Sequence, residues 1–241
     1  MSRARLILLG VASVLAVVAL TAPAASAKIS FEWFVGGSLL AKGEERTFDY
    51  NTDGHTFDFH TAIAGLEVLL LSTNVSVEDG LLFGGRPGDS REAIIFRSVT
   101  VAKPVNCVVA IPHLLNPVLG KIDSGPMNDE IVEGENGEVL ILITPEVGSS
   151  FIEVLFLDKS ATETCPLKNV IVNIEGNVLA LPSSQKKELL RQDLVFPSVE
   201  NNFFLSSGTL DKAALLYLGQ PVTLQGLTLA LLASDAVWGP F

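Results

Sequence analysis

Short apolar runs, separated by glycine and proline, recur along this chain and limit what it can fold into. The runs Val139–Ile143, Phe151–Leu157 and Leu227–Leu232 span five to seven residues, which is typical of a strand and short for a helix. One polar residue at most interrupts each run, as in strands buried on both faces. We therefore predict an all-β, antiparallel fold, either a β-sandwich or two packed, similar β-modules.

Two other segments alternate apolar and polar residues, as strands with one buried face do. They are Arg46–Asn51 and His55–His60. Asp53-Gly54 lies between them and is a strong signal for a hairpin turn, because glycine accepts a positive φ. We expect the two segments to pair with each other.

Sequence that favours helix is scarce. The best candidate is Ser183–Gln192, which follows Pro182, begins with two serines that could cap it and continues with good helix formers. We expect at most one or two short helices.

A faint internal similarity bears on domain organisation. Gly37–Ala41 resembles Gly176–Ala180, although apolar strand sequences also match by chance. If the similarity is a duplication, residues 28–103 and 165–241 are two pseudo-repeated β-modules. No linker rich in Ser, Thr or Pro divides the chain, so we expect a single β-rich domain over residues 28–241.

Residues 1–27 have the pattern of a secretory signal peptide. Arg3 and Arg5 precede the apolar run Leu6–Ala22, and Ala25–Ala27 is a small-residue cleavage site. The run has 17 residues, fewer than the roughly 20 of a spanning helix. We expect cleavage, with no membrane span afterwards, and a secreted, extracellular protein that associates with the cell envelope or is released. An uncleaved anchor is the alternative.

The chain has two cysteines, Cys107 and Cys165. In an exported chain an even pair predicts a disulfide. A metal pair and a catalytic thiol are the alternatives, but the spacing is not Cys-x-x-Cys, and a lone exported thiol would be oxidised.

Charge argues against one class of partner. Without the two arginines of the leader, the chain has 14 basic and 27 acidic residues, a net charge of −13. The phosphate backbone of nucleic acid repels so acidic a surface. The partners that remain are a cell-envelope polymer or another surface protein.

Familiar catalytic motifs are missing from the sequence. It contains no Gly-x-Ser-x-Gly elbow, no His-Glu-x-x-His helix and no phosphate-binding loop. Of the three histidines, His55 and His60 would face opposite sides of a strand and so could not share a metal ion. No catalytic residue is predicted.

The stretch Asp49–Gly54 matches the first half of a calcium loop, in which Asp49, Asn51 and Asp53 would supply oxygen ligands. The match then fails, because position 12 of the loop is His60 instead of glutamate. A hairpin with a polar tip is favoured, and calcium is the alternative. No other cofactor is expected.

Two further groups of residues have alternative interpretations. The acidic cluster could gather a hard cation, or form a solvated loop or strand edge. Aromatic residues could form a carbohydrate platform, although core packing is favoured. The acidic cluster is Asp129, Glu130, Glu133, Glu135 and Glu138, and the aromatic residues are Phe31, Trp33, Phe34, Tyr217, Trp238 and Phe241.

Several stretches carry a resemblance. They are Gly85–Gly88, Asn106–Val109, Ile131–Gly134 leading to Leu140–Pro145, Cys165–Lys168 leading to Gly176–Ala180, and Gly239–Phe241. In these the chain resembles an uncharacterised family of exported bacterial β-rich proteins with no established activity. The resemblance implies a shared disulfide, transfers no catalytic residue and does not include Asp49–Gly54.

These patterns predict an exported, non-enzymatic structural or binding module of the cell surface or extracellular space. The alternative is a hydrolase that acts on envelope polysaccharide, or a lectin-like carbohydrate binder. That alternative requires a groove with converging carboxylates or aromatic side chains.

Overall fold

The computed structural model describes residues 31–241, except 53, 86–87, 198–200 and 206. All regular secondary structure in these residues is β, and all strand pairs are antiparallel. The all-β, antiparallel prediction is confirmed. The expected signal peptide, residues 1–27, lies outside the described residues. No helix in the described part of the chain is long and apolar enough to cross a membrane.

Eight strands close into an antiparallel barrel, which we call the closed barrel. Neighbours pair in the order β3-β6-β7-β10-β11-β14-β15-β19, and β19 returns to β3 through Leu229 opposite Asn51. A sandwich leaves edges on its sheets, whereas this ring leaves none. The strands are β3 (Glu45–Asn51), β6 (Asn74–Phe83), β7 (Ser90–Arg97), β10 (Ile122–Gly134), β11 (Val139–Pro145), β14 (Val178–Pro182), β15 (Arg191–Phe196) and β19 (Gln220–Leu232).

A second curved sheet continues from one end of the first, and we call it the open barrel. Its order is β8-β5-β4-β19-β18-β13-β12-β9. Its edge strands, β8 and β9, follow each other directly in the chain. Besides β19, the strands of the open barrel are β4 (Phe57–Ile63), β5 (Leu66–Ser72), β8 (Thr100–Lys103), β9 (Cys107–Ala110), β12 (Ser150–Asp158), β13 (Ile171–Gly176) and β18 (Leu215–Tyr217).

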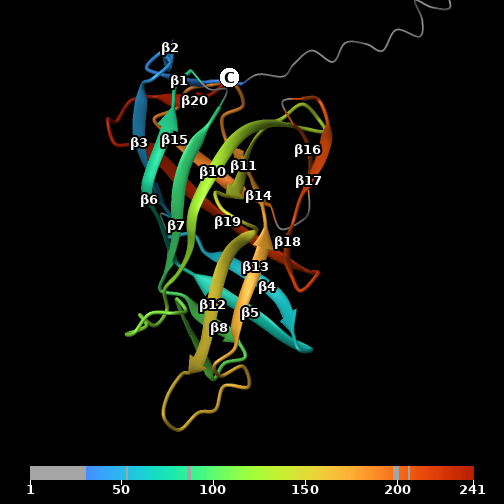
Figure 1. Cartoon of the computed structure of the whole chain (residues 1–241). Helices are drawn as coiled ribbons and strands as arrows, with labels where there is room; N and C mark the ends of the chain where they lie inside the picture. Colours follow the sequence, from blue (N-terminus) through green and yellow to red (C-terminus); the bar gives the residue numbers. More distant parts are fainter. Residues whose placement is uncertain (1–30, 53, 86–87, 198–200, 206) are drawn as a thin grey trace, which may run out of the picture.

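The chain alternates between the two barrels, usually two strands at a time (Figure 1). Among the described strands, only β19 belongs to both: its first half pairs with β18 and β4, and its second half with β15 and β3. The stretches 28–103 and 165–241 therefore contribute strands to both barrels, and neither forms a sheet of its own.

The predicted hairpin between Arg46–Asn51 and His55–His60 is wrong. These segments fall on β3 and the start of β4, which do not pair with each other along their described lengths; both pair with β19. The turn at Gly54, where φ is 84°, leads the chain from one barrel into the other. Alternation predicted the strands correctly, but it carries no information about their partners.

Three short strands cover the free end of the closed barrel. They are β1 (Trp33–Val35), β2 (Ser38–Leu39) and β20 (Trp238–Pro240), and they lie together at the top of Figure 1. A hairpin of β16 (Asn201–Phe204) and β17 (Leu210–Ala213) packs against the outside of the barrel. It covers a small second core that includes Val132, Leu140 and Phe203.

The helix predicted over Ser183–Gln192 is wrong. The segment is an irregular connection that leads into β15, and Lys186 within it has a positive φ of 56°. Two of its side chains bind distant parts of the chain: the Gln185 amide oxygen accepts the Val139 amide at 2.6 Å, and the Gln192 amide nitrogen donates to the Trp238 carbonyl at 2.6 Å. These tertiary hydrogen bonds outweigh a helix propensity of a few tenths of a kcal/mol per residue.

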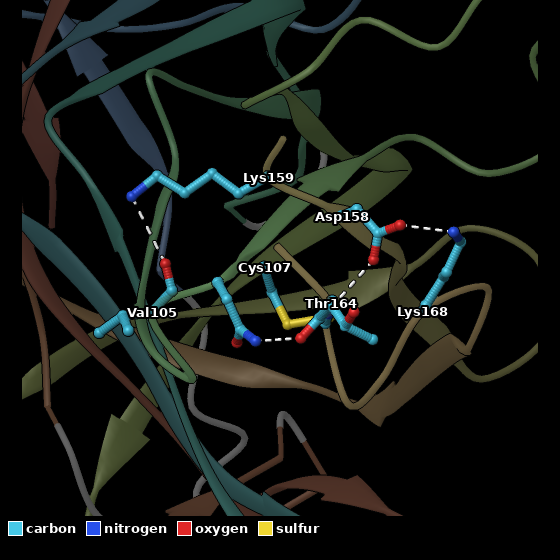
Figure 2. Close-up of a disulfide and its surroundings, with 8 residues drawn as sticks. Val105, Cys107, Asp158, Lys159, Thr164 and Lys168 are labelled. Carbon is cyan, nitrogen blue, oxygen red and sulfur yellow. Dashed lines mark hydrogen bonds and ion pairs between the residues drawn. A yellow bond between two sulfur atoms is a disulfide. The ribbon is translucent and has the colours of Figure 1, made fainter. Parts of the chain in front are cut away.

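The predicted disulfide is confirmed. Cys107 on β9 is bonded to Cys165 in the loop after β12, and both residues are buried (Figure 2). Cys107 lies opposite Asp158 in the β9–β12 pair. The bond ties an edge strand of the open barrel to a loop that has no regular structure of its own.

Candidate functional site

Side chains fill the interiors of both barrels. Phe57, Phe96 and Phe196 meet where the barrels join, with ring centroids 5.8 and 5.2 Å from that of Phe57. The open barrel encloses a space of only about 10 Å³, lined by residues such as Phe59 and Phe156. A small ligand needs roughly 300 Å³ or more. A candidate site must therefore lie on the outer surface or consist of the interior side chains themselves.

The aromatic residues proposed as a carbohydrate platform mostly serve the core. Trp33 and Trp238 are buried with centroids 5.6 Å apart, and Phe48 of the closed barrel lies 6.4 Å from Trp238. The tryptophans thus plug the end of the closed barrel. Phe34 and Phe241 pack on each other at 4.6 Å beside them.

One interior position is unusual, because two acids face into the closed barrel. Glu92 on β7 is 1% exposed and Asp129 on β10 is 4% exposed. Glu92 lies opposite Met127 and Asp129 opposite Ser90, so the acids occupy diagonal positions on neighbouring strands. The Ser90 hydroxyl donates to Asp129 Oδ2 at 2.7 Å. We call Glu92 and Asp129 the acid pair.

Tyr50 on β3 lies close to both acids of the pair inside the closed barrel. The strand between β3 and β7 is β6, which has a bulge at Asp79 and Gly80 opposite Glu92. A Cβ atom on Gly80 would lie 2.5 Å from the Phe48 carbonyl oxygen of β3, so the bulge requires glycine at this position. The tyrosine contact falls short of a well-formed hydrogen bond, because both Glu92 oxygens remain without a partner.

Burial dominates the ionisation of this group. It raises the pKa of Asp129 to about 7, against the hydrogen bond from Ser90. Burial, and then the charge of Asp129, raise the pKa of Glu92 well above its ordinary value. Burial and the two nearby carboxylates also raise the pKa of Tyr50. All three groups therefore favour their protonated, neutral forms.

The acid pair is not among the sites predicted from the sequence, although a signal for it is present. The sequence pattern places Asp129 in the acidic cluster, for which a cation site or a solvated loop or strand edge is expected. Asp129 alternates with Met127 and Ile131, and Glu92 with Ile94, so each acid shares the inward face of its strand with buried apolar residues. Of the other members of the cluster, Glu130 and Glu133 lie on β10. Glu135 and Glu138 lie in the β10–β11 turn, where the Glu138 carboxylate accepts the Asn136 amide at 2.9 Å.

The residues of the proposed calcium loop lie on β3 and just after it. Asp49 is exposed, and its Oδ1 accepts the backbone amides of Tyr50 at 2.7 Å and Val77 at 3.1 Å. Asn51 is exposed at the end of β3, and Asp53 lies outside the described residues. Among the residues that the structure describes, no three His, Cys, Asp or Glu side chains are grouped as metal ligands.

Three carboxylates line a groove of about 340 Å³ on the outer surface, at the β11–β12 turn. They belong to Asp123, Glu146 and Glu153. Burial, and to a lesser degree Glu78, raise the pKa of Asp123, while Lys121 opposes the shift. Glu146 Oε2 lies 2.9 Å from Arg91, and Glu153 Oε2 lies 3.7 Å from His113. We call this feature the acidic groove.

A projecting loop lies beside the acidic groove and connects β9 to β10 (Figure 1). We call Ile111–Gly120 the apolar loop, since His113 is its only ionisable side chain. A bridge between Ala110 and Leu119 closes its base. Four aliphatic side chains stand in solvent: Leu114 is 46% exposed, Leu115 101%, Val118 55% and Leu119 58%. Contiguous apolar patches on a protein surface commonly mark interaction sites.

Comparison with known proteins adds no relative. The chain matches no family model, no curated protein and no solved structure.

Proposed function

We propose that this chain is an exported, non-enzymatic structural or binding module of the cell surface or extracellular space, and that it contacts its partner through the apolar loop. The observation that carries the proposal is the exposure of Leu114, Leu115, Val118 and Leu119 on one short loop. The partner is a cell-envelope polymer or another surface protein.

The position of the loop supports a binding role. Both barrels already bury a full core, so these four side chains are not required for folding. Exposed aliphatic groups lower solubility unless they are covered, and the energetic gain on covering them is about 25 cal/mol per Å². The Ala110–Leu119 bridge closes the base of the loop. The loop can therefore present these four side chains to a partner without losing much conformational entropy on binding.

The disulfide supports export. Disulfides persist in oxidising compartments and are rare where thiols are kept reduced. The Cys107–Cys165 bond joins residues far apart in sequence and leaves no free cysteine in the described chain.

A co-sedimentation assay tests the binding role. Residues 28–241 would be mixed with the producer's isolated cell envelope, as the natural protein and as the Leu114→Ser, Leu115→Ser double variant. Leu218→Ser is the matched control, because Leu218 is 84% exposed and lies in the β18–β19 turn, outside the apolar loop. We expect the loop variant to lose most of the sedimented fraction and the control to keep it. Equal sedimentation of all three proteins, or of none, would contradict the proposal.

The acidic groove favours a second candidate, a hydrolase or lectin-like protein that acts on envelope polysaccharide. Asp123, with its raised pKa, has the property required of a general acid, and Glu146 and Glu153 line the same groove. Incubation with envelope polysaccharide should then release reducing ends, and Asp123→Asn should abolish the release. Absence of release from polysaccharide, together with absence of binding to it, would remove this candidate.

A further inference from the structure

Among the residues that the structure describes, no cationic side chain forms an ion pair with the acid pair. Glu92 Oε1 and Oε2 and Asp129 Oδ1 are buried without a hydrogen-bonding partner. An isolated buried carboxylate costs far more free energy than its neutral acid, so such a group either finds a cation or takes up a proton. The pair is not used by the proposed function, since it is sealed from the surface.

The strands around the pair supply no cation. Tyr50 faces it from β3, Leu82 from β6, and Ile143 lies beside Asp129 from β11. Charged residues near the pair on its own and adjacent strands point outward. Arg91 contacts Glu146, and Glu78 contacts Arg97. Asp79, in the β6 bulge opposite Glu92, is exposed. Among the described residues, Tyr50 is thus the only other titratable side chain at the pair.

A metal ion fits poorly in place of a proton. Calcium takes six to eight oxygen ligands and magnesium takes six. The unpaired oxygens at the pair number three, from two carboxyl groups, and the described residues group no three acidic or histidine ligands. The small number of unpaired oxygens therefore favours protons over a metal ion as the species bound at the acid pair.

We infer that Glu92 and Asp129 form a proton-binding site inside the closed barrel, and that protons on this pair hold the barrel closed. Each carboxylate takes up one proton as the barrel folds, and the new O–H group donates to an oxygen that otherwise has no partner. When protons leave, two like charges remain next to each other in an apolar interior. The barrel is then expected to loosen or open.

The expected pH dependence has a definite sign. A folded-state pKa above the unfolded value gives stability that is present below the unfolded pKa and is lost as pH rises through the folded pKa. For Asp129 that window runs from about pH 4 to about pH 7. Each proton held only by the folded state makes the unfolding equilibrium constant rise up to tenfold per pH unit. The constant should therefore increase on the order of a hundredfold or more across the window.

Unfolding by urea, measured from pH 4 to pH 9, tests this inference. The proteins are the natural chain, the Glu92→Gln, Asp129→Asn double variant and the control Glu135→Gln, which changes an exposed acid in the β10–β11 turn. We expect the natural chain and the control to lose stability as pH rises, and the double variant to lose much less. Parallel pH profiles for all three would overturn the inference.

An infrared measurement covers the case in which the double variant does not fold. The folded natural chain at pH 6 should show the carbonyl-stretch band of a protonated carboxylic acid, and unfolding at that pH should remove most of it. Each single variant should remove about half of the band. A spectrum with no such band would overturn the inference without any need for the double variant. Chelator should change neither result, whereas a chelator-sensitive midpoint would indicate a metal instead.

Discussion

Asp158 Oδ1 accepts the backbone amide of Cys165 at 2.9 Å, and the same residue lies opposite Cys107 in the β9–β12 pair (Figure 2). The carboxylate of Asp158 thus positions the Cys165 end of the disulfide, and its backbone lies opposite the Cys107 end. The second oxygen of the carboxylate binds the Lys168 ammonium. The loop after β12 is therefore tied to the open barrel by a covalent bond and by charged hydrogen bonds.

Replacing this carboxylate should lower stability in a pH-dependent manner. The hydrogen bond from Lys168, and then that from the Cys165 amide, lower the pKa of Asp158. A lowered pKa gives stability that is present above the unfolded value, near 4, and is lost as pH falls. We expect Asp158→Asn to unfold at a lower temperature than the natural chain at pH 7, with the difference shrinking toward pH 3. A constant difference across this range would show that the charge is not what stabilises the loop.

Removing the disulfide should have a larger effect. The bond closes a loop with a sequence separation of 58 residues, for which loop entropy gives about 4 kcal/mol. We expect the Cys107→Ser, Cys165→Ser double variant to lose about that much free energy of unfolding in urea. The natural chain treated with reductant provides the control and should match the variant. Alkylation of the unreduced protein should label neither cysteine.

Gly226 is the position where β19 passes from the open to the closed barrel. A Cβ atom there would lie 2.6 Å from the Phe57 ring, while Phe196 lies opposite Gly226 in the β15–β19 pair. Gly226→Ala should therefore destabilise the protein by about 1–3 kcal/mol, as overpacking does.

A double-mutant cycle separates this clash from a general effect on the strand. Phe57→Leu alone should lower the free energy of unfolding. In the Gly226→Ala background the same substitution should lower it less, or not at all, because the smaller side chain relieves the clash. Thr223→Ala, on the same strand away from the ring, serves as the control and should be close to neutral. Additive costs for Gly226→Ala and Phe57→Leu would contradict the contact.

The two tryptophans of the plug differ in one hydrogen bond. The Trp33 indole donates to the Asp89 carbonyl at 2.9 Å, whereas the Trp238 indole nitrogen is buried without a partner. Trp33→Phe should cost about 1 kcal/mol more than Trp238→Phe, because both lose similar volume but only one loses a hydrogen bond. Fluorescence of the remaining tryptophan during urea unfolding measures each variant. A larger loss for Trp238→Phe would contradict this account.

Local pattern predicted the strands better than their arrangement. Three apolar runs all lie in strands: Val139–Ile143, Phe151–Leu157 and Leu227–Leu232. Consecutive residues of a strand determine which of its faces are buried, so a local pattern can reveal the strand. Which strands pair depends on contacts far apart in sequence, such as Asn51 with Leu229. A local pattern contains no information about such distant partners. The sequence therefore predicts a hairpin and a sandwich, whereas the structure forms a barrel.

The candidate features show the same division. Cysteine count and compartment were enough to predict the Cys107–Cys165 bond. The acid pair can be recognised only when charge and strand alternation are considered together, since charge alone places Asp129 with the solvated acids. The apolar loop was not predicted, because leucine and valine in the sequence carry no sign of whether they will be covered.

The shared strand β19 also sets the order in which the molecule can be completed. Until residues 220–232 have been synthesised, the closed barrel has a gap between β15 and β3, and the open barrel has a gap between β18 and β4. Both gaps are filled by one strand near the end of the chain. Neither barrel can therefore close before this strand pairs, and both leave unpaired strand edges until it does.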